Sequence, residues 1–169
     1  TASVNLTFDD TPPVTSMALS QNNTVVSPTD WHTEAVTVSF AVNDTNEVSL
    51  TEYRYRNETS WTPYTGPFNI SRHLLENTLY YRSLDTANNL ELYTLGTVKI
   101  DTQPPRFITA NLSSSSVYPG AEVTLFAQIN ESLSGVAKAV ASVNGTNYTL
   151  LSDEQMYGTT IAAPETDGS

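Results

Sequence analysis

The sequence predicts an all-β fold, with β-sandwich modules in tandem. Short segments of alternating apolar and polar residues recur along the 169 residues, separated by turns rich in Asn, Asp, Gly and Pro. A sequence motif that ends in Pro-Pro occurs twice, and its two copies are about one sandwich module apart. Long segments with apolar residues at helical spacing are lacking, and Lys and Arg together number only seven.

The repeated motif sets the expected boundary between the two modules. Residues 4–13 read VNLTFDDTPP and residues 98–105 read VKIDTQPP, so Phe8 aligns with Ile100 at a spacing of 92 residues (100 minus 8). Proline cannot donate a hydrogen bond to a neighbouring strand and stiffens the backbone. Pro-Pro therefore marks the point where one module ends and the next begins.

Alternating segments account for most of each expected module. The first module, residues 10–101, has six of them, and residues 35–42 alternate strictly. The second, residues 102–169, has five and the hairpin turn Asn144-Gly145, but lacks counterparts of the last two strands of the first. The expected strands are 14–20, 35–43, 49–56, 68–71, 78–84 and 92–100, then 107–113, 122–130, 136–144, 148–151 and 156–162; one helical turn is an alternative at residues 72–77.

Residues 1–9 have the pattern of the last strand of a module whose body is absent. They are either the last strand of a preceding module, cut from a longer array, or a donor strand. In the second case they complete the second module of another copy and build a fibre. Residues 1–9 would supply only one strand, whereas the second module lacks two.

Several motifs resemble the immunoglobulin-like repeats of bacterial and archaeal surface and cell-wall proteins, including surface-layer and sheath proteins. The resemblance covers most of the chain and implies immunoglobulin-like or fibronectin-III-like sandwiches at a cell surface. Asn88 stands where these repeats usually have Gly, and Asn tolerates the left-handed backbone that the turn needs. The matching residues are Asp10-Thr11-Pro12-Pro13, Trp31, Thr51-Glu52-Tyr53-Arg54, Trp61-Thr62-Pro63-Tyr64-Thr65-Gly66-Pro67-Phe68, Asp85-Thr86-Ala87-Asn88-Asn89 and, in the second module, Glu131-Ser132-Leu133-Ser134-Gly135-Val136.

The net charge of −11 excludes several partners. Nucleic acids and anionic membrane surfaces are bound by clustered Lys and Arg, which this chain does not have. No segment has 18 consecutive apolar residues, so we expect no membrane insertion. The absence of cysteine excludes disulfides and favours a prokaryotic cell surface or cell wall. The expected partners are neighbouring modules or other copies of the protein.

Catalysis is not expected. The chain has two histidines, His32 and His73, and neither belongs to a recognisable catalytic motif. The acidic pairs Asp9-Asp10 and Asp153-Glu154 could imitate a glycosidase dyad, but adjacent acids usually lie in solvated turns. We therefore predict a structural protein that is not an enzyme.

N-linked glycosylation is the best-supported modification. Nine of the 14 asparagines stand in the acceptor pattern Asn-x-Ser/Thr, whereas chance would give about a quarter, because 43 of the 169 residues are Ser or Thr. Thr-rich strands beside Asn-rich turns also create this pattern by composition alone. The candidate acceptors are Asn5, Asn22, Asn43, Asn57, Asn69, Asn111, Asn130, Asn144 and Asn147.

Calcium is a second candidate ligand. Asp9, Asp10 and Asp101, with Asp85 and Glu91, lie at the expected module ends, where their carboxylates could bind Ca²⁺ and stiffen the array. The alternative is a set of acidic turn residues in water, since the chain has no acidic loop of the EF-hand type.

Aromatic residues allow a third interpretation, a binding module that recognises a surface glycan or another surface partner. Rings that stack on sugars must be exposed, whereas rings that fill a sandwich core are buried. Tyr53 and Tyr55 share one face of their strand, and Tyr80 and Tyr81 point to opposite faces. The remaining candidates are Trp31, Trp61 and Tyr64.

Overall fold

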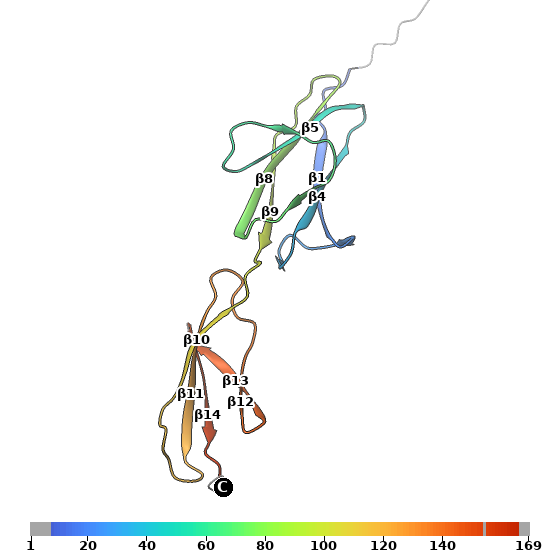
Figure 1. Ribbon diagram of the computed structural model, residues 1–169. Helices are drawn as coiled ribbons and strands as arrows, with labels where there is room; N and C mark the ends of the chain where they lie inside the picture. Colours follow the sequence, from blue (N-terminus) through green and yellow to red (C-terminus); the bar gives the residue numbers. More distant parts are fainter. Residues whose placement is uncertain (1–7, 154, 166–169) are drawn as a thin grey trace, which may run out of the picture. The chain divides into compact units, whose positions relative to one another are not determined.

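The protein is described by a computed structural model that covers residues 8–153 and 155–165. Within these residues every regular element is a β-strand, and the strands form three sheets, which confirms the all-β prediction. The chain divides into two compact units, residues 1–102 (unit 1) and 103–169 (unit 2) (Figure 1). A helix long and apolar enough to cross a membrane is not found among the described residues.

Unit 1 has two sheets. The four-stranded sheet has the order β2-β1-β4-β7, and the five-stranded sheet has the order β3-β9-β8-β5-β6. The strand bounds are β1 Val14–Gln21, β2 Thr24–Val25, β3 Trp31–His32, β4 Val36–Asn43, β5 Val48–Tyr55, β6 Thr62–Pro63, β7 Phe68–Ile70, β8 Leu74–Asp85 and β9 Thr94–Ile100.

One apolar core lies between the two sheets of unit 1, as in a β-sandwich. Alternation along β4 turns Val36 and Val38 inward, where both are fully buried. From the opposite sheet Leu79, Val98 and Ile100 meet them with 0% exposure. Successive side chains of a strand point to opposite faces, so the alternation in the sequence corresponds directly to this burial.

The structure corrects the sequence prediction at several short segments. Strand β8 begins at Leu74, so the alternative of a helical turn at residues 72–77 is wrong. A bulge between Leu74 and Asn77 lets this strand continue, and the Asn77 amide donates to the carbonyl groups of Arg72 and Val98. The strands β2, β3 and β6 were not predicted, because a pair of residues is too short to show alternation.

Asparagine supplies the left-handed backbone at the tight turns. Asn144 and Gly145 have φ values of 49° and 79° between paired Val143 and Thr146, which confirms the predicted two-residue hairpin turn. Asn88 has a φ of 72°, so it does adopt the left-handed conformation expected of a residue that replaces glycine there.

Unit 2 has one five-stranded sheet with the order β10-β11-β14-β13-β12. Residues 146–150 of β13 pair with β12, whereas residues 151–153 pair with β14. Its main core cluster is small and joins Ala127, Ala139, Leu150 and Tyr157. The strand bounds are β10 Arg106–Leu112, β11 Glu122–Asn130, β12 Ala139–Val143, β13 Thr146–Asp153 and β14 Met156–Ala162.

Truncation of Leu79 tests the core of unit 1. We expect Leu79→Ala to lower the free energy of unfolding by about 2–5 kcal/mol, because a fully buried side chain leaves a cavity. Both tryptophans lie in unit 1, so their fluorescence during urea unfolding reports on this unit. The control Leu92→Ala, at a site 84% exposed, should change stability by no more than about 0.5 kcal/mol. Equal losses for the two variants would contradict this core.

Candidate functional site

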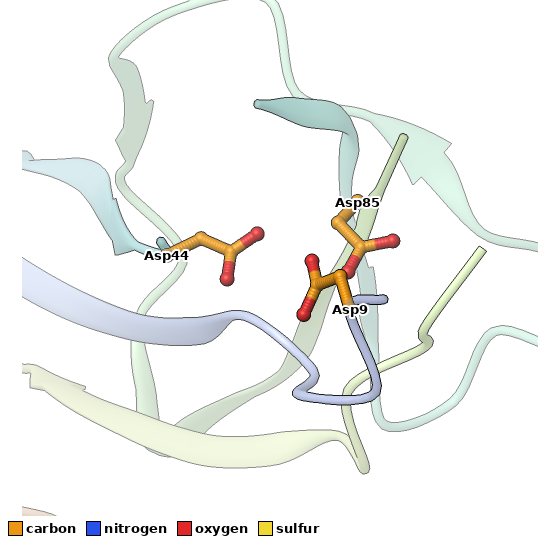
Figure 2. Close-up of side chains that lie close together, drawn as sticks. All are labelled: Asp9, Asp44 and Asp85. Atoms are coloured by element: carbon orange, nitrogen blue, oxygen red, sulfur yellow. The ribbon is translucent and has the colours of Figure 1, made fainter. Parts of the chain in front are cut away.

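Three carboxylates meet at one end of unit 1. Asp9 precedes β1, Asp44 follows β4, and Asp85 ends β8, and one oxygen of each lies within 4.8 Å of the other two. Figure 2 shows the side chain of Asp44 directed toward the pair formed by Asp9 and Asp85. We call Asp9, Asp44 and Asp85 the carboxylate cluster.

Asp85 is the buried member of the carboxylate cluster, with 1% exposure. Its Oδ1 accepts a hydrogen bond from the backbone N–H of Asn89 at 2.8 Å, and its Oδ2 accepts from Asn89 Nδ2 at 2.8 Å. Burial acts to raise the pKa of Asp85, but the hydrogen bonds from Asn89 and from the backbone of Ala87 outweigh it, and the pKa lies below its ordinary value. Asp85 is therefore a carboxylate at neutral pH.

Asp9 is held beside Asp85 by two asparagines. Asn89 Nδ2 donates to the backbone carbonyl of Asp9 at 3.0 Å, and Asn46 Nδ2 donates to Asp9 Oδ2 at 2.5 Å. Asp9 Oδ1 accepts from the N–H of Thr11 at 3.1 Å, which forms a local turn before the Pro-Pro pair. These bonds fix the chain where it enters unit 1.

Asp44 is the member of the cluster whose carboxylate is only partly hydrogen-bonded. Its Oδ1 accepts from the N–H of Thr45 at 2.8 Å, whereas its Oδ2 is shielded from water and has no hydrogen-bond partner among the described residues. A buried acceptor of this kind is costly unless a donor or a cation satisfies it. Carboxylate oxygens are also the ligands that Ca²⁺ prefers, so a divalent cation is chemically suited to the carboxylate cluster.

The acidic residues that were predicted from the sequence as calcium ligands lie at different places in unit 1. Asp10 is exposed, while Asp101 lies at the end of unit 1 where β8 begins, away from the carboxylate cluster at the end of β8. Asp101 is 4% exposed; its carboxylate lies 3.3 Å from His73 Nδ1 and its N–H donates to the carbonyl of His32. Asp44 was missed because it stands alone in an Asn-rich turn, and only the fold brings it near Asp9.

Glu91 belongs to a buried polar contact between the two sheets. Its side chain accepts hydrogen bonds from the backbone N–H of Thr15 at 2.9 Å and of Ser83 at 3.0 Å. The hydroxyl of Thr15 also donates to Glu91 at 2.5 Å. These bonds join β1 to the neighbourhood of β8, so this carboxylate is satisfied by the protein itself.

The two histidines have structural contacts. His32 is 5% exposed, and its Nε2 lies 3.0 Å from the carbonyl oxygen of Ser27. His73 Nδ1 lies 3.2 Å from the N–H of Thr102 as well as near Asp101. The His73 ring therefore contacts the residues at which the chain leaves unit 1, whereas the His32 ring contacts the loop between β2 and β3.

The candidate glycosylation sites are open to solvent wherever the structure describes them. Eight of the nine acceptor asparagines are exposed, and the ninth, Asn5, lies outside the described residues. Asn22 and Asn144 occupy turns with positive φ, Asn57 follows β5, and Asn69 and Asn111 lie within strands. The other exposed acceptors are Asn43, Asn130 and Asn147.

The aromatic residues divide between the core and the outer face of unit 1. Tyr53, Tyr55 and Tyr64 pack against the core, and burial raises the pKa of Tyr53 and Tyr55. Trp61 is half-buried, with the Arg82 guanidinium 4.1 Å and the Arg54 guanidinium 5.1 Å from its ring centroid.

The remaining rings follow the alternation of their strands. Tyr81 is buried, whereas Tyr80 lies on the outer face with Tyr93, at 5.0 Å between ring centroids. Trp31 is half-buried beside Lys99, whose Nζ lies 6.0 Å from the ring centroid. Two of the outer rings thus already contact guanidinium groups, since Arg54 also lies 4.6 Å from the centroid of Tyr80.

Comparisons of the chain with protein-family models, with curated proteins and with solved structures found no match.

Substitution of Asp85 tests the hydrogen bonds around its carboxylate. Folding lowers the pKa of Asp85 from its ordinary value of 3.8, so its stabilisation is fully present above that value and is lost as the pH falls through the lower folded-state pKa. We expect Asp85→Asn to destabilise unit 1 at neutral pH and to flatten its loss of stability in acid. Urea unfolding followed by tryptophan fluorescence measures both. The exposed Asp30→Asn is the control; parallel pH profiles for all three proteins would refute the assignment.

Calcium addition tests the carboxylate cluster as a metal centre. At a hundredfold excess over its dissociation constant, a bound ion would stabilise unit 1 by about 2.7 kcal/mol. We therefore expect Ca²⁺ to raise the Tm by several degrees, Asp44→Asn to abolish the rise, and the control Asp30→Asn to retain it. An equal Tm in calcium and in chelator would show that the carboxylates lie in water without a metal ion.

Proposed function

We propose that this chain is a non-catalytic structural segment of a glycosylated, extracellular surface protein of the surface-layer, sheath or filament kind. Its units would act as immunoglobulin-like modules set end to end. One observation carries the proposal: the chain enters unit 1 beside Asp85, at the end of β8, and leaves it beside His73, next to the start of β8. The 12 residues of β8 separate these points by about 40 Å.

This arrangement suits a spacer. A unit whose chain enters and leaves at opposite ends adds its full length to an array. Hydrogen bonds hold the chain at both ends, through Asn46 and Asn89 at Asp9 and through His32 at Asp101. Pro12-Pro13 follow Asp9 in the sequence, Pro104-Pro105 follow Asp101, and each pair stiffens the backbone there. Calcium is the cofactor that we propose for the carboxylate cluster, supported by Asp44 Oδ2, which has no hydrogen-bond partner in the part of the chain that the structure describes.

The surface chemistry supports a location outside the cell. Exposed acceptor asparagines occur in both units, so glycans would coat the whole segment. The net charge of −11 favours solubility and disfavours binding to nucleic acid or to an anionic membrane. Neighbouring modules and other copies of the protein remain the proposed partners.

A carbohydrate-binding or partner-binding adhesive module is the second candidate. The outer face of unit 1 favours it, since Tyr93 and Leu95 are about half exposed there beside Tyr80. The guanidinium groups over Trp61 and Tyr80 would have to move before a sugar ring could stack on them. Binding of the purified chain to surface polysaccharides, lost in Tyr93→Ala, would favour this adhesive function.

Material from the producing cells tests the proposed function. We expect an intact mass above that of the peptide, and glycopeptides at exposed acceptors such as Asn22 and Asn57. A membrane-impermeant label should also reach the protein on whole cells, and an abundant internal protein serves as the control for leakage. A bare peptide mass together with protection from the label would overturn the proposal.

A further inference from the structure

The outer face of the five-stranded sheet in unit 1 carries more cations than acids. Tyr53 and Leu79 pack against the core, so the residues that alternate with them along their strands point outward. Residues 52–55, 79–84 and 94–100 form the middle of the three central strands of this sheet, and their charged side chains are Arg54, Arg82, Lys99 and Glu52. In a chain with 18 acidic and seven basic residues, this face is a place of locally positive charge.

Arg54 belongs to a row of side chains that crosses this face. Strand pairing places Arg54 of β5 opposite Tyr80 of β8, and Tyr80 opposite Leu95 of β9. Trp61 directly precedes β6, the strand on the other side of β5. The Arg54 guanidinium carbon lies 4.6 Å from the ring centroid of Tyr80 and 5.1 Å from that of Trp61. Contact with two rings restricts the orientation of the guanidinium before any ligand binds.

The two arginines of this face differ in their partners. Arg82 donates to Glu52 Oε1 through Nε at 2.7 Å and lies 2.6 Å from it through Nη2, so a carboxylate balances its charge. Arg54 Nη1 donates to the backbone carbonyl of Glu58 at 2.6 Å, and within the described part of the chain Arg54 forms no ion pair with a carboxylate. A guanidinium has several N–H donors in a planar fork that matches a carboxylate. Arg54 therefore keeps donors for an anionic group from outside.

Tyr93 provides an exposed ring beside this guanidinium. Its ring centroid lies 5.0 Å from that of Tyr80 at an interplanar angle of 84°, and Tyr93 is 48% exposed. Arg54 and Tyr93 both contact Tyr80, so the distance between them does not exceed the sum of their distances to that ring. A sugar can stack the apolar face of its ring on an exposed aromatic ring while a guanidinium binds its carboxylate. A short chain of linked sugars is long enough to make both contacts.

We propose that Arg54 and Tyr93 form a binding site for a carboxylated sugar, as in an extracellular polysaccharide that contains uronic acid. The inference rests on the adhesive function given above as the second candidate, and it specifies the ligand. Arg54 binds the carboxylate with its N–H donors, and Tyr93 stacks on the sugar ring. The guanidinium groups over Trp61 and Tyr80 stay in place, because the sugar stacks on neither of these rings. An acidic peptide also offers carboxylates, but acidic side chains lack the flat set of C–H groups that suits Tyr93.

Short oligomers of uronic acids test the proposal, because the charge of the ligand can be removed without altering the protein. The probes are trimers of galacturonic acid and of mannuronic acid, each compared with its methyl ester by isothermal titration calorimetry in the presence of a chelator. We expect at least one acid to bind, and its ester to bind about tenfold to a hundredfold more weakly, the factor that corresponds to a hydrogen bond to a charged group. Binding of the acid should also weaken as salt is added.

Matched variants assign the binding to these two residues. We expect Arg54→Gln and Tyr93→Ala each to lower the affinity for the acid by about tenfold or more, and Tyr93→Phe to retain it. Arg54→Lys keeps the charge but not the planar fork, so its affinity should lie between those of wild type and Arg54→Gln. Lys99→Gln removes a cation of the same face that lies beside Trp31, and it should bind the acid like wild type. Urea unfolding of each variant checks that unit 1 is folded.

Equal affinities for the acids and their esters, or an equal loss in Lys99→Gln and Arg54→Gln, would overturn the proposal. So would an oligomer of glutamate that binds as tightly as the uronic acids, since the face would then recognise acidic protein. If the esters bind as well as the acids and Tyr93→Ala abolishes both, the adhesive function stands and the preference for carboxylate is wrong. If no sugar binds, this site and the adhesive function both fail, while the structural function is tested separately by location and glycosylation.

Discussion

A β-sheet with one apolar face is stable in water only when a second layer covers that face, and the organisation of this protein follows from that constraint. Unit 1 satisfies it with its own strands: Val36 and Val38 on one sheet meet Leu79 and Val98 on the other. Unit 2 satisfies it only in part, through a hairpin folded over one end of its sheet. Among the described residues, the same physical requirement thus gives a closed core in unit 1 and leaves an apolar groove in unit 2.

The polar contacts of unit 1 are concentrated at its two ends. Asn89 is central at one end, because its side chain donates both to Asp85 and to the backbone of Asp9. At the other end, the buried Asp101 contacts His32 and His73. Hydrogen bonds to carboxylates are among the stronger ones, so those of Asp85 stabilise the end at which the chain enters unit 1. The core holds the sheets together, and these contacts hold the chain to the core.

The long strands could be predicted from the sequence because alternation records burial directly. The strand at Val36–Asn43 was predicted within one residue, and that at Glu122–Asn130 without error, since each has many residues in register with one buried face. The pairs Thr24–Val25 and Thr62–Pro63 carry no such pattern and become strands only through their neighbours. The carboxylate cluster was predicted only in part for the same reason. Asp9 marks a module end in the sequence, but its approach to Asp44 depends on how the loops of two sheets meet.

The carboxylate cluster lies at the point where the chain enters unit 1. Asp9 belongs to the cluster, and its side chain also accepts the hydrogen bond that forms the turn before Pro12-Pro13. A cation bound to Asp9, Asp44 and Asp85 would therefore reduce the conformational freedom of the backbone at this point. Cation binding and backbone order would favour each other, because whatever orders this stretch of chain lowers the entropy cost of the other step. The hydrogen bonds from Asn46 and Asn89 already hold Asp9 in place without a metal ion, so calcium would strengthen this order and would not be required for it.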